Sequence, residues 1–493
     1  MKKYILTIDQ GTTSTRAILF NQSGQIVHSA FKDVKCLYPA PSYVETDALE
    51  LWLSVLAVVN EVLITANVSL EDVDSIGITN QRETTIVWDK VTGMPVYNAI
   101  VWQSRQSASY CDALETKKDF IFNKTGLLIN PYFSASKIRY ILDHIKDGQA
   151  RAERGELLFG TVDSWIIYKL TNGRVHATDI SNASRTLLFN IFDRQWDRDL
   201  LALFNIPSVM LPKVFPSSHT FGHCEFLKVP VPIAGVAGDQ QASLFGHLCL
   251  DKGDSKNTYG TGCFMLMNIG SKPCLAKGGL LTTVAWQIGN KVTYAFEGSV
   301  FVGGAAVQWL RDEMQLIRTA KYSEKEASKA CKNDGVYVVP AFVGLGTPYW
   351  DDKARGAVFG LTRATSKSEF IRATLESIAY QTKDVFSVME EASKIDLKRL
   401  QVDGGATSNG YLMQFQADLL DCQIRVAKIM ETTSLGVLFL AGLETGFFSS
   451  INEIKKLKYE GTVYKPKMTS DVREQLYRGW KKAVKATQSF SQE

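Results

Sequence analysis

The sequence lacks the features that mark membrane or nucleic-acid proteins. It contains no stretch of eighteen apolar residues, so no membrane-spanning helix is predicted. Its net charge is only +4, without a block of like charges, which gives no reason to expect a nucleic-acid or membrane partner. The first apolar run ends at Asp9, too early for a secretory signal. We therefore expect a cytoplasmic protein.

Metal-binding and dinucleotide motifs are missing as well. The eight cysteines are scattered, with no C-x-x-C pair and no zinc-like spacing to histidine, so free thiols are the simplest interpretation. Neither the phosphate loop G-x-x-x-x-G-K-[ST] nor the fingerprint G-x-G-x-x-G occurs. If this chain binds a nucleotide, it does so with another kind of phosphate-binding loop.

What is present is the composition of an ordinary globular protein, with 45% hydrophobic and 22% charged residues. A chain of 493 residues is long for one hydrophobic core, so two domains are predicted. We place their border between Cys249 and Lys256, where a helical pattern ends and a fresh strand pattern begins. The predicted domains are residues 1–250 and 251–493.

Residues 5–20, ILTIDQGTTSTRAILF, read as a strand, a tight polar turn and a second strand. Gly11 would let a phosphate approach the backbone, and Arg16 would offer a positive fork. Hydroxyls that could donate to the phosphate are those of Thr12, Thr13, Ser14 and Thr15. Asp9, at the strand end, could hold Mg²⁺ through water. Taken alone, a hairpin with a polar turn explains this stretch equally well.

A similar strand and turn, LQVDGGATSNGYLMQ, occupies residues 400–414, and a third Gly/Thr turn surrounds Thr261. Two strand-Asp-Gly segments about four hundred residues apart suggest two related halves that face one nucleotide.

Further motifs are GITNQRETTIVW at 77–88, PYFSASKIRYILDH at 131–144, AGDQQASLFG at 237–246 and GLGTPYWDDKARGAVFGLTR at 344–363. With these motifs the chain resembles the FGGY carbohydrate kinase family from about Lys3 to about Ala486. The resemblance implies an α/β, two-domain, actin/hexokinase-like (ribonuclease H-like) fold with an interdomain cleft. Polyol and phosphates would lie on the N-terminal side, and the adenine nucleotide on the C-terminal side.

The activity that the resemblance implies is ATP-dependent phosphorylation of glycerol to sn-glycerol 3-phosphate, with Mg²⁺. A kinase of this fold for another polyol or ketose, such as xylulose or dihydroxyacetone, is the nearer alternative. An actin-like or chaperone-like ATPase is the alternative from another class. The resemblance also implies a homo-oligomer, either a dimer or a tetramer.

The resemblance assigns site residues by motif. Asp239 would be the general base, and the polyol-binding residues would be Arg82, Glu83, Trp102, Tyr132, Asp239, Gln240 and Phe264. The nucleotide-binding residues would be Thr12, Thr13, Ser14, Arg16, Thr261, Gly304, Gln308, Gly405 and Asn409, with Asp9 at the metal. Simpler interpretations remain open: Asp239 as a helix N-cap, Arg82 and Glu83 as a surface pair, the aromatics as plain core, and the glycines as turns.

Two local features qualify this assignment. In a regular strand Arg82 and Glu83 face opposite sides, so both reach one ligand only if the chain turns there. Where relatives carry a phosphorylatable histidine loop or a bisphosphate-binding loop, neither His219 nor His223 is in frame, and Pro230 stands near the position of the expected arginine. We expect weak or no control by phosphohistidine transfer or fructose 1,6-bisphosphate.

Hydrophobic periodicity predicts the remaining elements. Helices are expected over 48–66, 136–144, 304–313, 367–391, 410–419 and 434–446, and strands over 73–79, 257–268, 280–288 and 292–297. A strand-like run over 94–102, a helix opening near Trp102, and an irregular connection over 207–232 are also expected.

Overall fold

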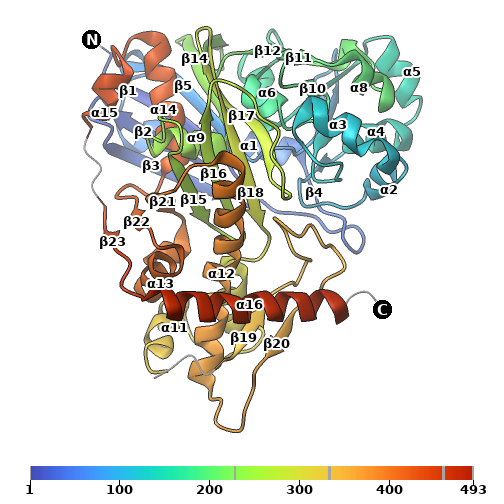
Figure 1. Ribbon diagram of the computed structural model, residues 1–493. Helices are drawn as coiled ribbons and strands as arrows, with labels where there is room; N and C mark the ends of the chain where they lie inside the picture. The colour runs from blue at the N-terminus through green and yellow to red at the C-terminus, as the bar shows by residue number, and fades with distance from the viewer. Residues whose placement is uncertain (1, 227–228, 331–334, 458–460, 491–493) are drawn as a thin grey trace.

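A large central sheet organises the chain in the computed structural model, which describes residues 2–226, 229–330, 335–457 and 461–490 (Figure 1). Thirteen strands of the described residues form this sheet, in the order β23, β22, β21, β15, β16, β18, β17, β13, β14, β5, β1, β2, β3. We refer to β13, β14, β5, β1, β2 and β3 as the first half of the sheet, and to the other strands as the second half.

The strands of the first half are β1 (Tyr4–Gln10), β2 (Ser14–Asn21), β3 (Ile26–Asp33), β5 (Val73–Asn80), β13 (Ser218–Cys224) and β14 (Val231–Gly238). Those of the second half are β15 (Ser255–Tyr259), β16 (Cys263–Gly270), β17 (Leu281–Ile288), β18 (Lys291–Val300), β21 (Arg399–Asp403), β22 (Gln423–Val426) and β23 (Val463–Tyr464). Strands β1 and β2 pair antiparallel, and β1 pairs parallel with β5. The Asp9 turn and the Asn80 end therefore lie at one edge.

Helices cover both faces. Around the first half lie α1 (Ala48–Thr65), α4 (Ser134–His144), α6 (Val162–Leu170), α7 (Ile180–Ala183), α9 (Asp239–Gly246), α14 (Thr432–Thr445) and α15 (Ile451–Lys455). Around the second lie α10 (Gly304–Asp312), α11 (Ala320–Ala327), α12 (Lys367–Ser393), α13 (Gly410–Leu420) and α16 (Ser470–Phe490). Shorter helices α2 (Ala108–Asp112), α3 (Lys118–Thr125), α5 (Gly148–Glu153) and α8 (Arg198–Leu203) form a layer beside the first half (Figure 1).

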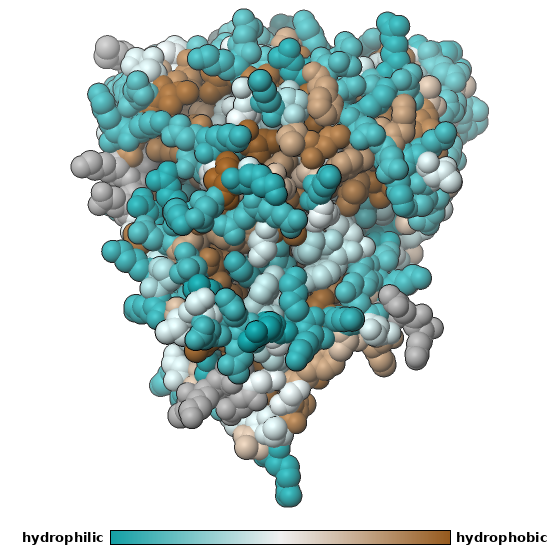
Figure 2. Space-filling model, in the orientation of Figure 1, coloured by the Kyte–Doolittle hydropathy of each residue, from teal (hydrophilic) through white to brown (hydrophobic). Residues whose placement is uncertain are grey.

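Helix α1 is apolar enough and long enough to cross a membrane by those two criteria alone. In this fold its buried side chains, among them Leu51, Val55, Val58 and Val62, belong to one core with β1, β2 and β5. We interpret α1 as a core helix, because its apolar stripe faces the sheet. On the face seen in Figure 2, hydrophilic side chains surround the smaller apolar areas.

The chain passes from the first half to the second through residues 247–254 and returns through residues 427–431, and β23 of the second half follows α15. After the second passage, α14 packs against α9 and against strands β14, β5 and β1. Glycines make this packing close: a Cβ added to Gly436 would lie 1.9 Å from the Ala242 carbonyl oxygen, and one added to Gly77 would lie 2.7 Å from the Val437 oxygen. Residues 432–445 thus complete the core of the first half.

Most predicted elements are confirmed, including both strand-turn segments and α1, but three predictions are wrong. Over 94–102 only Ala99–Ile100 forms a strand, β7, because the rest pairs as isolated bridges or turns. The helix expected to open at Trp102 begins at Ala108. Residues 207–232 contain β12 (Lys213–Phe215), β13 and the start of β14; their prolines lie outside β12 and β13, and Pro232 is the second residue of β14. The amphipathic helix α16 is absent from the sequence prediction.

Candidate active site

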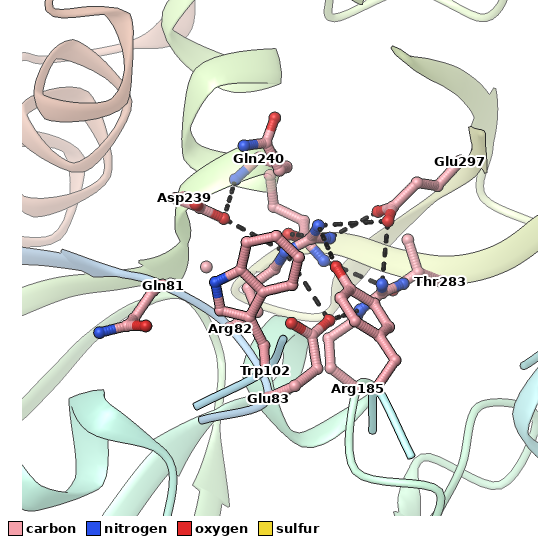
Figure 3. A network of polar contacts seen from close by, with 12 residues as sticks. Gln81, Arg82, Glu83, Trp102, Arg185, Asp239, Gln240, Thr283 and Glu297 are labelled. Atoms are coloured by element: carbon pink, nitrogen blue, oxygen red, sulfur yellow. Dashed lines mark hydrogen bonds and ion pairs between the residues drawn. The ribbon is translucent and has the colours of Figure 1, made fainter. Parts of the chain in front are cut away.

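Arg82 and Glu83 follow β5 after one residue, Gln81, and the chain turns at Glu83, whose φ is +60°. The turned backbone is held by Ser134 and Thr85, whose hydroxyls donate to the Glu83 carbonyl at 3.1 and 3.0 Å. The turn brings both side chains into one buried network (Figure 3). The chain thus turns at this pair, as it must if both side chains are to reach one ligand. The surface-pair interpretation is wrong, because both side chains are buried.

Asp239 is the first residue of α9, and Gly238 occupies the cap position. Its carboxylate accepts from the Gln240 backbone N–H at 2.7 Å and lies 3.2 Å from Arg82 Nε (Figure 3). A Cβ at residue 238 would lie 2.7 Å from Arg82 Cγ, so glycine allows this contact. Asp239 remains partly exposed, so its carboxylate is available to a ligand instead of serving as an N-cap.

Three aromatic rings lie beside this carboxylate. Trp102 contacts Tyr132 and Phe264 edge to face, with ring centroids 5.5 and 6.1 Å apart. Arg82 lies over the Phe264 ring and reaches the Tyr132 hydroxyl at 3.5 Å. None of the three is fully buried, so they can form apolar walls around a small ligand.

The Gln240 side chain faces the second half of the sheet. Its amide oxygen accepts from the ammonium of Lys256, on β15, which also donates to the Thr258 hydroxyl at 2.8 Å. Burial lowers the pKa of Lys256 to about 8, opposed by the charges of Asp403 and Asp239. The sequence analysis missed Lys256, although it stands five residues before Thr261.

Arg185 and Glu297 were also missed, and both bond to the Arg82–Glu83 pair (Figure 3). Glu297, on β18, accepts from Arg82 Nη1 at 2.5 Å and Nη2 at 3.2 Å, and from Arg185 Nη2 at 2.9 Å. Arg185 Nε donates to Glu83 at 2.6 Å. Burial alone would raise the pKa of Glu297, but the Arg185 and Arg82 guanidiniums lower it to about 2. No local motif indicates a role for Glu297, because only the pairing of its strand in the sheet places it at the site.

The turn between β1 and β2 has the tight geometry that its sequence predicts, since the Gly11 N–H donates to the Ser14 carbonyl at 2.9 Å. Thr12 accepts from the Trp102 indole at 2.9 Å, which joins this turn to the aromatic walls. Thr12, Thr13 and Ser14 remain at least partly exposed. The prediction that the Thr15 hydroxyl could donate to a phosphate is wrong. Thr15 lies inside strand β2, is buried, and bonds Ser54 at 2.6 Å.

Arg16 pairs with Glu431 of the second passage between the halves, with Nη1 to Oε2 at 2.8 Å. Both side chains are partly exposed. A phosphate at this turn would therefore compete with Glu431 for the guanidinium.

Asp9 is the candidate metal ligand at this turn. Thr433 donates to its Oδ2 at 2.7 Å. Burial raises the pKa of Asp9 to about 6, the Thr433 hydrogen bond opposes this, and the charge of Asp239 adds to it. A cation between the two carboxylates would relieve their repulsion, and oxygen ligands suit Mg²⁺. Among the described residues no group of three or more His, Cys, Asp or Glu could hold a metal.

A cavity of about 350 Å³ is lined by residues of the second half. Its lining includes every nucleotide residue predicted on that side, namely Thr261, Gly304, Gln308, Gly405 and Asn409. Gly304 packs so closely that an added Cβ would lie 2.7 Å from the Gly260 oxygen. The Asn409 side chain caps α13 by accepting from the Leu412 N–H. Arg311 and Lys321 also line this cavity and were not predicted.

Comparisons with known proteins point in one direction. Residues 4–246 match the N-terminal domain of the FGGY family of carbohydrate kinases, and residues 255–444 match its C-terminal domain. The chain is 56% identical over 495 residues to a glycerol kinase of Bacillus cereus (strain Q1), covering 99% of this chain and 100% of that protein. It is 57% identical, with the same coverage, to a glycerol kinase of Bacillus licheniformis.

Among solved structures, glycerol kinase of Plasmodium falciparum with ADP matches with a TM-score of 0.92 and 35% identity, covering 98% of both chains. Gluconate kinase of Lactobacillus acidophilus matches with a TM-score of 0.88 at 22% identity, covering 99% of this chain and 98% of that one. The second likeness concerns the fold alone.

Proposed function

This chain belongs to the FGGY family of carbohydrate kinases, and from that premise we propose that it transfers the terminal phosphoryl group of ATP to glycerol. The products are sn-glycerol 3-phosphate and ADP. The observation that carries this proposal is the meeting of Arg82, Glu83 and Asp239 beside three aromatic rings. The identity of 56% to proteins named glycerol kinase supports the choice of polyol.

Arg82 and Glu83 are suited to adjacent hydroxyls, because a guanidinium donates hydrogen bonds and a carboxylate accepts them. Glu83 accepts from Arg185 through Oε1, which leaves Oε2 for a substrate hydroxyl. Trp102, Tyr132 and Phe264 would cover the C–H face of the triol. A pocket walled this way fits three carbons better than a long sugar.

Asp239 is suited to take the proton of the attacking hydroxyl. In a loose phosphoryl-transfer transition state the proton leaves late, so a carboxylate can serve as the base. Arg82 Nε, 3.2 Å away, orients the carboxylate.

The phosphates would lie on Thr12, Thr13, Ser14 and Arg16, facing Thr261, with adenosine in the 350 Å³ cavity. Asp9, with Asp239 near it, would hold Mg²⁺, which compensates phosphate charge when bound. Closure of the two halves would exclude water that could otherwise accept the phosphoryl group. We also propose that the protein is a cytoplasmic homo-oligomer and that its domains divide near residue 250.

A substrate panel tests the proposed function. With purified protein, ATP and Mg²⁺, we expect kcat/KM for glycerol to exceed that for xylulose by about a hundredfold or more, because extra carbons must fit among the rings of Trp102, Tyr132 and Phe264. Dihydroxyacetone, which has three carbons but lacks the central hydroxyl, serves as the matched comparison. A preference for a pentulose would reject glycerol as the substrate, and ATP hydrolysis unchanged by any acceptor would favour an actin-like ATPase.

The pH dependence of Mg²⁺ binding tests Asp9. Its raised pKa of about 6 means that the metal must displace a proton below that pH. We therefore expect the apparent Mg²⁺ dissociation constant to rise by about tenfold per pH unit below pH 6 and to be nearly constant above pH 7. Magnesium titrations in the presence of ADP measure this dependence. The same dependence in Asp9→Asn would show that another group is responsible.

A further inference from the structure

Residues 179–185, DISNASR, form a buried polar segment beside the proposed active site. The segment consists of the last residue of β9 (Ala177–Asp179), the short helix α7 and the two residues after it. None of its residues is more than 2% exposed, and α7 packs against β14 and β17. Apart from Arg185, the proposed function gives these residues no role. Because buried polar side chains are hydrogen-bonded, their partners indicate what the segment holds in place.

Asp179 fixes the conformation of this segment. Its carboxylate accepts from the backbone N–H groups of Ser181 and Asn182 at 2.9 Å each. It also accepts from the Ser181 hydroxyl and the Asn182 amide, again at 2.9 Å each, and from the Ser217 hydroxyl at 2.7 Å. A carboxylate only accepts, so the Ser181 hydrogen and the Asn182 NH₂ group must face it. The orientation of both side chains is thereby determined.

Ser181 holds the residue that precedes the proposed base. Because its hydroxyl hydrogen faces Asp179, its oxygen can accept, and the Gly238 backbone N–H donates to it at 3.0 Å. Gly238 is the cap residue of α9, and the next residue, Asp239, lies 3.2 Å from Arg82 Nε (Figure 3). A displacement of Gly238 would therefore displace the carboxylate that is proposed to accept the proton.

Asn182 holds the last residue of β5. The amides of Asn182 and Asn80 bond reciprocally, since each Nδ2 donates to the Oδ1 of the other at 3.1 Å. Asn80 also donates to the carbonyl of Gln81 at 2.9 Å, one residue before Arg82. Asn80 and Gly238 are direct partners in the pairing of β5 with β14. The segment therefore holds two neighbouring strand ends, one leading to the polyol-binding pair and the other to the base.

We propose that Ser181 and Asn182 are positioning residues for the phosphoryl transfer. Ser181 fixes the position of Asp239, and Asn182 fixes the turn that carries Arg82 and Glu83. This inference rests on the proposed function. Both side chains act through backbone groups, and misplacement of a reacting group by about 1 Å can cost about a hundredfold in rate. The two residues affect different constants, because the base determines kcat whereas the polyol-binding pair determines KM for glycerol.

Separate substitutions test the two roles in the full-length protein. Initial rates are measured at varied glycerol with saturating ATP and Mg²⁺, and kcat is referred to the concentration of ADP-binding sites, so that an unfolded fraction does not lower it. S181A leaves the Gly238 N–H without its acceptor, and we expect kcat to fall by about tenfold while KM for glycerol changes by about twofold or less. N182A should instead raise KM for glycerol by about tenfold and lower kcat less.

The matched control is S217A. Ser217 is fully buried and donates to the same carboxylate of Asp179, but its oxygen accepts from the Gln287 N–H of β17, at 3.3 Å, and not from a residue next to the proposed base. We expect S217A to lower the melting temperature, as S181A does, because each removes a buried hydrogen bond. Its kcat and its KM for glycerol should stay within about twofold of the unmodified protein.

A double variant separates positioning from a general structural effect. If Ser181 acts through Asp239, S181A has nothing further to disturb in a D239N background, and kcat of S181A/D239N should lie within about twofold of D239N. The proposal is overturned if S181A lowers kcat of D239N by the same factor as that of the unmodified protein, or if S217A lowers kcat as much as S181A. Unchanged kinetics in S181A or N182A would also overturn it. Failure of the proposed function would be distinct, since the unmodified protein would then not phosphorylate glycerol.

Discussion

Asp239→Asn will reduce kcat for glycerol phosphorylation by about 10²–10⁴-fold, the usual contribution of a general base. Asparagine has the same shape and can still face Arg82 Nε, now 3.2 Å from the carboxylate, but it cannot accept the hydroxyl proton. The nucleotide residues lie on other elements, so ADP affinity should change by about twofold or less. Initial rates together with ADP titration measure the two quantities on the same preparation.

The comparison that makes this result informative is Asp239→Glu, which keeps the carboxylate but moves it along α9. Glutamate should restore part of the activity if proton transfer is the role of this residue, because the basic group is again present. If Asp239→Asn keeps kcat within a few-fold, another group accepts the proton and the assignment is wrong.

Glu297→Gln will raise KM for glycerol by about 10–100-fold, corresponding to the loss of one strong charge-assisted hydrogen bond. Glu297 receives both Nη groups of Arg82 and one of Arg185. Without its charge the two guanidiniums repel each other, and Arg82 loses the bidentate partner that fixes its orientation beside Asp239. We expect KM for ATP to change by about twofold or less, because the nucleotide cavity is lined by other residues.

The control for this variant is Glu376→Gln. Glu376 is a second buried carboxylate of the same half, paired with Arg372 at 2.7 Å but outside the glycerol pocket. Both variants should lower the melting temperature, since each unbalances a buried ion pair. Only Glu297→Gln should raise KM for glycerol. Equal glycerol KM values in the two variants would show that Glu297 has only a structural role. A glycerol KM in Glu297→Asp between those of the unmodified protein and Glu297→Gln would support its positioning role.

The sequence predicted the parts of the site that lie on local motifs. Strand β1, its turn and Asp9 follow from a short apolar run that meets Gly and hydroxyl residues, a pattern set by neighbours in the chain. Asp239 was assigned because AGDQQASLFG resembles the FGGY motif that carries the general base, whereas its place before an apolar pattern alone favoured an N-cap. The five nucleotide residues of the second half come from separate motifs, and they line one cavity.

Glu297, Arg185 and Lys256 could not be predicted in this way, because their roles depend on pairing between distant strands. Glu297 lies in strand β18, where no motif of polar residues surrounds it. Only the order of β16, β18 and β17 in the sheet places it near Arg82. The sequence prediction also failed on 207–232, where the proline content was taken to indicate an irregular connection, although β12 and β13 form between prolines. Long-range pairing overrides local propensity in such cases.

The return of α14 to the first half has a consequence for synthesis on the ribosome. Leu435, Val437, Leu438 and Phe439 share one core with Ile5 and Phe20, although more than four hundred residues separate them in the chain. Since domains are made from the N-terminus onward, the earliest strands leave the exit tunnel long before this helix exists. Their apolar face stays exposed until then. We therefore expect chaperone binding to the nascent chain to be greatest late in translation and to end when residue 445 emerges from the ribosome.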